Sequence, residues 1–193
     1  MKDFLKGKKL ILASGSPRRQ TFFKDLHLSF EIRLKPIDEV FPSRLKGKAI
    51  TNYLAKLKAA AFAGEIKVDE ILVTSDTIVW FNGKALNKPQ DEQEAIKMLS
   101  KLSGKTHQVI TSVCIKTIDK EVIFHDKTDV KFVKLMPNEI AYYVNQFMPL
   151  DKAGAYGIQE WIGLIGIKSI NGSYCNVVGL PTHKLFQYLK KIV

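Results

Sequence analysis

The first residues that could do chemistry form the run Ser14-Gly15-Ser16-Pro17-Arg18-Arg19. This run follows an apolar stretch at 9–13, and Ser16 and Pro17 are residue types that favour the start of a helix. A strand that passes through small residues into a helix N-terminus offers backbone N–H groups to an anion, and two arginines add planar donors that match phosphate oxygens. The run therefore indicates either a phosphate site or a well-capped helix with surface arginines. It lacks the GxxxxGK[ST] pattern of a P-loop.

A second candidate lies at Thr74-Ser75-Asp76-Thr77. Residues 71–75 have the composition of a buried strand, and we expect Asp76 to stand where that strand ends. A carboxylate in such a place commonly binds a metal or moves a proton. The alternative is a turn-forming aspartate that leads into the hairpin predicted at Asn82-Gly83.

Two lysines are candidates for binding an anion. Lys58 lies one turn after Leu54 on the helix that the apolar spacing predicts from Ile50 to Ala61. Lys88 precedes Pro89 on a loop before the next predicted helix. The chain has 30 lysines and arginines, so position alone does not separate these two from solvated surface lysines.

Two further segments are rich in small residues. Residues 151–159 connect a helix to a strand, and their glycines allow a ligand to approach the backbone closely. Residues 176–181 are predicted to be mainly structural. The four histidines and two cysteines show no metal-ligand spacing, and neither cysteine stands in a context that would activate it.

The elements that position these residues mix helix and strand. We expect strands at 9–13, 30–34, 71–75, 78–81, 109–118, 122–135, 163–170 and 174–178. Helices are expected to begin at Pro17, Ile50, Asp91, Pro137 and Pro181, the third with a capping box and a C-terminal Gly104. The mixture predicts an α/β fold with a mixed β-sheet and flanking helices.

Composition bounds the remaining possibilities. The 193 residues are 46% hydrophobic and 25% charged, which excludes disorder and coiled coil for the whole chain and fits one domain or one domain with two lobes. No apolar run approaches the length of a membrane span, so we expect a soluble cytoplasmic protein. The net charge of +11 attracts polyanions, although no basic run or basic-aromatic stretch points to nucleic acid.

Taken in order, these segments resemble the Maf-type nucleoside triphosphate pyrophosphatase family. Eight motifs carry the resemblance: SGSPRR at 14–19, IDE at 37–39, LAKLKA at 54–59, SDTIV at 75–79, NKP at 87–89, LSGKTHQV at 102–109, DKAGAYGIQ at 151–159 and NGSYCNVVGLP at 171–181. They cover nearly the whole chain. The stretch DKAGAYGIQ resembles the group that acts on dTTP and UTP, rather than the group that acts on 7-methyl-GTP.

The resemblance implies roles for individual residues. Ser14, Arg18 and Arg19 would bind the triphosphate, Lys58 and Lys88 would contact phosphates, and Thr77 and Gln159 would select the base. Asp76 would accept the proton of the attacking water, and Glu39 with Asp76 would hold the metal. Lys152 is a further candidate for a phosphate contact. Three positions depart from the family pattern: Ser75, where alanine is usual, and Glu160 and Trp161, where glycine is common beside the proposed base pocket.

The resemblance also implies a fold and a reaction. The fold would be of the inosine triphosphatase type, a single domain over 1–193 with two lobes around a cleft. A nucleoside triphosphate and water would give the monophosphate and pyrophosphate with Mg²⁺ or Mn²⁺, in a homodimer. The alternatives are a 7-methyl-GTP pyrophosphatase and a non-catalytic, basic nucleic-acid-binding or division-regulating module, which only the net charge supports.

Overall fold

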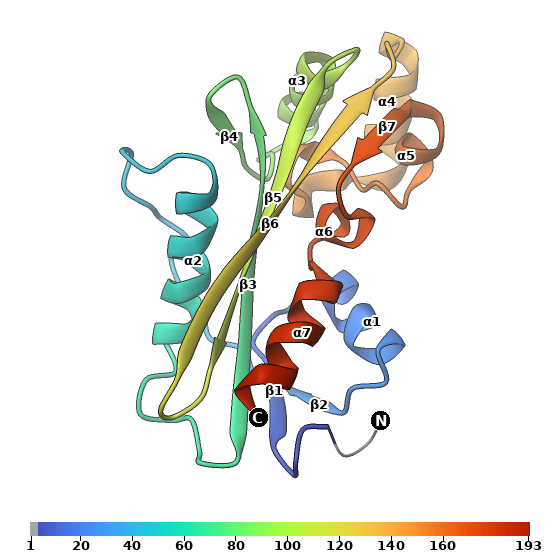
Figure 1. Cartoon of the computed structure of the whole chain (residues 1–193). Coiled ribbons are helices and arrows are strands. Elements are labelled where there is room, and N and C mark those ends of the chain that lie inside the picture. Colours follow the sequence, from blue (N-terminus) through green and yellow to red (C-terminus); the bar gives the residue numbers. More distant parts are fainter. Residues whose placement is uncertain (1–3) are drawn as a thin grey trace. The chain divides into compact units, whose positions relative to one another are not determined.

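The computed structural model describes residues 4–193, whose strands form one mixed sheet (Figure 1). The strands are β1 (Lys9–Leu12), β2 (Phe30–Ile32), β3 (Glu70–Phe81), β4 (Lys84–Leu86), β5 (Thr106–Lys116), β6 (Glu121–Phe132) and β7 (Ile167–Asn171). Their order is β2-β1-β3-β5-β6-β7, and β4 pairs with β3 off this path. β1 runs parallel to β2 and β3, whereas the β3–β4 and β6–β7 pairs are antiparallel. The predicted mixed α/β fold is confirmed.

The helices are α1 (Pro17–Asp25), α2 (Lys48–Ala60), α3 (Glu92–Leu102), α4 (Pro137–Phe147), α5 (Trp161–Gly166), α6 (Tyr174–Val178) and α7 (Thr182–Ile192). Two single 3₁₀ turns, η1 (Pro149–Asp151) and η2 (Ala153–Ala155), follow α4. The predicted N-cap of α3 is confirmed, because Asp91 accepts a hydrogen bond from the Glu94 N–H. The capping box is only half formed, because the Glu94 side chain accepts from the Gln90 N–H at 2.8 Å and not from Asp91. The predicted Asn82-Gly83 turn has two residues with positive φ, which a tight hairpin of this kind requires.

The chain divides into two compact units. Unit 1 consists of residues 1–76, as far as they are described, together with Thr111–Asp126 and Gly179–Val193. Unit 2 consists of Thr77–Ile110 and Lys127–Val178. The expected single domain of two lobes around a cleft stays a prediction.

In unit 1, successive side chains of strand β1 pack into two different hydrophobic cores. Leu10 and Leu12 of β1 pack in a core with residues of α1 and α7, whereas Ile11 between them packs with Ala55 and Ala59 of α2. Successive side chains of a strand point to opposite faces, so α2 covers one face of these strands and α1 and α7 cover the other. Figure 1 shows the same arrangement. β1 and the first residues of β3 are thereby held between two helical layers.

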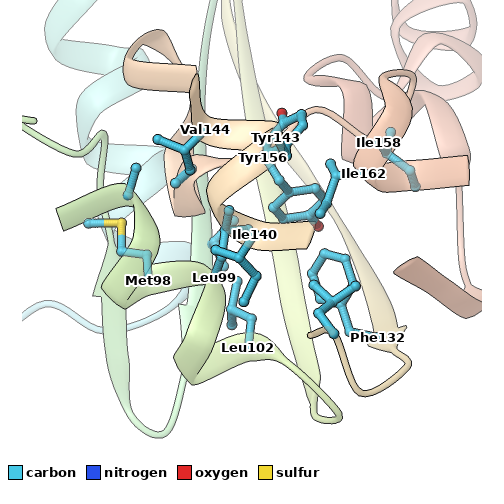
Figure 2. Close-up of a cluster of buried hydrophobic side chains, with 14 of the residues drawn as sticks. Met98, Leu99, Leu102, Phe132, Ile140, Tyr143, Val144, Tyr156, Ile158 and Ile162 are labelled. Carbon is cyan, nitrogen blue, oxygen red and sulfur yellow. The ribbon is translucent and has the colours of Figure 1, made fainter. Parts of the chain in front are cut away.

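Unit 2 has a core of its own, drawn in Figure 2. Leu99 and Leu102 of α3 and Ile140, Tyr143 and Val144 of α4 are almost completely buried in it. Residues 155–162, which overlap the glycine-containing stretch at 151–159, add Ala155, Tyr156, Ile158 and Ile162. This segment is therefore anchored by apolar side chains, although its composition is that of a loop.

Two strands predicted around Asp76 are in fact one. β3 runs without interruption from Glu70 to Phe81, so Asp76 lies within a strand and not at its end. Thr74 and Asp76 find partners inside the protein: the Thr74 hydroxyl donates to the Ala55 carbonyl at 2.7 Å, and Asp76 Oδ1 accepts from Lys58. The buried Ser75 hydroxyl has no hydrogen-bond partner among residues 4–193.

The strands predicted at 163–170 and 174–178 were also wrong in part. Residues 161–166 form helix α5, and only Ile167–Asn171 form a strand, β7. Residues 174–178 form helix α6, in which the buried Asn176 amide donates to the Val109 carbonyl and to the Thr128 hydroxyl. These tertiary hydrogen bonds override the strand preference of the β-branched residues nearby.

Candidate functional site

The loop between β1 and α1 is organised around a buried serine. The Ser14 hydroxyl oxygen accepts hydrogen bonds from the Ser16 N–H and from the Arg19 guanidinium, each at 3.3 Å. Ser16 stands at the N-cap position of α1 and Pro17 is the first helical residue, as predicted, although the Ser16 side chain makes no capping hydrogen bond.

Arg19 ties three segments of unit 1 together. Its guanidinium donates to the Ser75 carbonyl of β3 at 3.0 Å and to the Gly179 carbonyl at 2.9 Å, besides the Ser14 hydroxyl. Burial lowers the pKa of Arg19 and Asp76 opposes that shift. The sequence gives no indication of the carbonyl partners, because backbone groups carry no residue type. Arg18 is half-buried beside Arg19 in the first turn of α1.

Three charged residues from three separate segments meet next to this loop. Lys58 of α2 places its Nζ 2.8 Å from Asp76 Oδ1 of β3 and 2.8 Å from Glu39 Oε1 of the loop before α2. The Lys58 side chain is 15% exposed and that of Asp76 only 7%, whereas Glu39 is 45% exposed. The structure thus brings together five of the predicted site residues within unit 1: Ser14, Arg19, Glu39, Lys58 and Asp76.

The Asp76 carboxylate is buried, and only one of its two oxygens has a hydrogen-bond partner in residues 4–193. Burial raises the pKa of Asp76 above its ordinary value, and the charges of Lys58 and Arg19 act against that rise. Oδ1 accepts from Lys58, while Oδ2 is buried and has no hydrogen-bond partner among residues 4–193. A buried carboxylate oxygen left in this state is suited to a water molecule or a cation.

Apart from Arg18, the other predicted site residues lie in unit 2. Thr77 follows Asp76 on β3 and is half-buried. Lys88 is exposed and lines a pocket with Asn87, Lys97 and Met98. Gln159 is exposed, and it lies between the buried Ile158 and the half-buried Glu160. Their predicted contacts with phosphate and base stay predictions.

Lys152, the further phosphate candidate, is engaged inside unit 2. Its ammonium lies 2.6 Å from Asp151 Oδ1 and 3.1 Å from Glu160 Oε1, and its side chain is 10% exposed. Trp161, expected to crowd the base pocket, packs its ring edge-on against Tyr142 with centroids 4.9 Å apart. The sequence pattern alone did not show either contact.

Two features that would indicate other functions are absent from residues 4–193. Within residues 4–193 no group of three or more histidine, cysteine, aspartate or glutamate residues is gathered as in an all-protein metal site. In the same range no helix has the length and apolar composition needed to cross a membrane.

The chain is similar to several known proteins. The family model described as Maf-like protein matches residues 9–192. A dTTP/UTP pyrophosphatase of Flavobacterium psychrophilum is 61% identical over 94% of this chain and 93% of its own, and one of Flavobacterium johnsoniae is 55% identical over the whole of both chains. The solved structure of the Staphylococcus aureus Ham1 protein covers 94% of this chain and 100% of its own, with a TM-score of 0.51 and 15% identity, which supports the fold alone.

Proposed function

Because the chain belongs to the Maf-like protein family, we propose that it hydrolyses dTTP and UTP to the monophosphate and pyrophosphate. Relatives that match it from end to end, at 55% and 53% identity, are named dTTP/UTP pyrophosphatases. The reaction forms a bond between a water oxygen and the α-phosphorus and breaks the bond from that phosphorus to the bridging oxygen. One proton leaves the water, and negative charge develops on the departing pyrophosphate.

One observation carries this proposal: a lysine placed between two carboxylates beside an arginine-bearing helix start. Lys58 lies at 2.8 Å from both Asp76 and Glu39, and Arg19 is within electrostatic reach of the same Asp76. Such a site offers a proton acceptor together with fixed positive charge, and both are needed when water attacks a polyanion.

The same residues fit a divalent cation. Asp76 Oδ2 is a buried carboxylate oxygen without a hydrogen-bond partner in the described chain, and the partly exposed Glu39 carboxylate shares Lys58 with it. Mg²⁺ and Mn²⁺ prefer oxygen ligands of this kind and are held by one or two carboxylates with substrate phosphates. When bound, the cation would supply charge neutralisation for the triphosphate. We assign Glu39 and Asp76 as its protein ligands.

The chain's own residues divide the remaining work. Asp76 orients the attacking water and receives its proton, with its charge stabilised by Lys58. Ser14, Arg18 and Arg19 bind phosphate oxygens at the start of α1, where the helix dipole adds positive potential. We further assign Lys88 to a phosphate contact and Thr77 and Gln159 to base selection, on the resemblance of their motifs.

The test is pyrophosphate release from dTTP, UTP, CTP and 7-methyl-GTP with Mg²⁺ or Mn²⁺. Asp76→Asn keeps the shape of the side chain but removes the base, and we expect turnover to fall by about 10³-fold. Asp69→Asn is the matched control, because Asp69 is an exposed partner of Lys9 just before β3. Wild-type turnover in Asp76→Asn would remove Asp76 from the mechanism, and turnover mainly of 7-methyl-GTP would overturn the assigned substrates.

We also propose that the enzyme acts in the cytoplasm as a homodimer, as its resemblance to the family implies. Light scattering of the purified protein at micromolar concentration tests the second statement. A mass of twice 21.8 kDa is expected, and a mass of 21.8 kDa would contradict it.

A further inference from the structure

The predicted base-reading residue, Gln159, stands on a closed turn. The Glu160 N–H donates to the Gly157 carbonyl at 3.0 Å, which closes a four-residue turn with Gln159 at its third position. Gly157 and Ile158 are buried, whereas Gln159 is exposed. Ile158 belongs to the core of unit 2 seen in Figure 2. The turn therefore presents one polar side chain outward from a buried base.

A single tyrosine hydroxyl holds both ends of this turn. Tyr143 of α4 is completely buried, and its hydroxyl accepts a hydrogen bond from the Gly157 N–H at 3.0 Å. The same hydroxyl donates to Glu160 Oε2. Burial and the Glu160 carboxylate raise the pKa of Tyr143, so the hydroxyl keeps its proton and stays a donor.

The second oxygen of Glu160 is held as well. Glu160 Oε1 lies 3.1 Å from the nearly buried ammonium of Lys152, which also pairs with Asp151. The carboxylate lies so close to the turn that a Cβ placed on Gly157 would come within 2.7 Å of Glu160 Cδ. Glu160 is therefore fixed by Tyr143, by Lys152 and by the turn that it closes.

From this geometry we infer that Glu160 is a positioning residue that fixes the Gln159 turn for base selection. Glu160 acts through Tyr143 and Lys152 and makes no contact with the base itself. A polar group that is held in place discriminates between ligands better than one that can readjust, because a mismatched base is then left with unpaired groups. The inference rests on the proposed function and on the role assigned to Gln159.

The experiment compares selectivity, not activity alone. kcat and KM are measured for UTP and for CTP in the full-length wild type, Glu160→Ala, Glu160→Gln and Tyr143→Phe, together with the melting temperature of each. The control is Tyr142→Phe, which removes a hydroxyl from the neighbouring position of α4; that ring is half exposed and contacts Trp161.

We expect Glu160→Ala and Tyr143→Phe to lower the ratio of kcat/KM for UTP to that for CTP by about tenfold, mostly through KM, because buried partners lose their hydrogen bonds. Glu160→Gln keeps an acceptor for Tyr143 and should recover about half of this loss on a logarithmic scale. Tyr142→Phe should leave the ratio unchanged.

The outcomes separate the two proposals. A melting temperature that falls while the UTP/CTP ratio stays at the wild-type value would show that the network is only structural, and would overturn the inference. If Tyr143→Phe fails to fold, Glu160→Gln decides the question by the same ratio. A wild-type enzyme that does not hydrolyse UTP or dTTP would instead contradict the proposed function.

Discussion

Two lysines that lie two residues apart on one helix have different surroundings. Lys58 reaches Asp76 and Glu39 and is 15% exposed, whereas Lys56 is 50% exposed and pairs with Glu121 at 3.2 Å. A helix turns by about 200° over two residues, so the two side chains leave it on different sides. The motif resemblance implied a role for Lys58, and the structure places Lys58 beside the two carboxylates. Position in the sequence alone did not separate it from surface lysines such as Lys56.

This difference gives a prediction at the scale of one side chain. Lys58→Met should lower kcat/KM for dTTP by about 100-fold, because a buried Asp76 loses its charged partner and the triphosphate loses a cation. Lys56→Met should change kcat/KM by less than about twofold, since it removes an exposed ion pair. Pyrophosphate release measured for both variants checks this, with circular dichroism as evidence of folding. Equal losses in the two variants would contradict the assignment of Lys58.

At the scale of elements, long periodic segments were predictable and short ones near the site were not. The capped helix α3 and the hairpin turn at Asn82-Gly83 agree with the sequence because local side chains determine them. By contrast, the continuity of β3 depends on the buried partners of Thr74 and Asp76, and the helical state of 161–166 depends on packing. Neither feature is encoded in a local pattern. The sequence therefore predicted two strands where β3 is one, and it predicted strand at 163–166, where the structure has helix α5.

Helix α5 also needs a glycine for its packing. A Cβ on Gly163 would come within 1.8 Å of the Ile158 carbonyl oxygen, which belongs to the Gln159 turn. Gly163→Ala should therefore lower the free energy of unfolding by at least about 3 kcal/mol, because backbone must move to admit the methyl group. Gly64→Ala is the control: Gly64 has a φ of +79° but no atom within 4 Å of an added Cβ, so only backbone strain of about 1 kcal/mol applies. Urea denaturation compares the two, and similar losses would show that the contact with Ile158 yields easily.

For the whole molecule, the boundaries of the two compact units could not be predicted from the sequence. The family resemblance implied two lobes, which stays a prediction, and no linker in the sequence marks a boundary between the units. The reason is that β3, β5 and β6 each contain residues of both units, so the boundaries at 76/77, 110/111 and 126/127 fall inside strands. A composition change marks a linker between domains, whereas a boundary within a strand leaves no such change. The same applies to the site, whose residues in unit 1 come from segments far apart in sequence.

The stability of the molecule in acid depends on a buried ion pair in unit 1. Arg33 donates to both carboxylate oxygens of the buried Glu70, at 2.9 and 3.1 Å, and this lowers the pKa of Glu70 to about 2. A carboxyl with a depressed pKa stabilises the fold above its ordinary pKa of 4.5, and that contribution is lost as the pH falls toward 2. Arg33→Met should remove about 1–2 kcal/mol of this pH-dependent stability, allowing for the partial exposure of Arg33. Urea titrations at pH 5 and pH 3 measure the free energy of unfolding of the wild type and of the variant. If this free energy falls between the two pH values by the same amount in both proteins, the role of the pair is contradicted.

Unit 2 contributes to acid sensitivity at higher pH through His107. Its Nε2 shares a hydrogen bond of 2.7 Å with the buried Tyr156 hydroxyl, and burial lowers the pKa of His107 to about 4. In the unfolded chain His107 binds a proton near pH 6.5, whereas in the folded protein it does so only near pH 4. The free energy of unfolding therefore falls by about 3 kcal/mol as the pH drops from 6.5 to 4. His107→Gln should be less stable at pH 7.5 but should lose less stability between pH 6.5 and 4 than the wild type.

Both tryptophans, Trp80 and Trp161, lie in unit 2, so their fluorescence in urea reports on the unit that holds His107. The control is His183→Gln, at an exposed position on α7, which should keep the wild-type dependence of the free energy of unfolding on pH. If His107→Gln also keeps that dependence, His107 is protonated in the folded protein over this pH range.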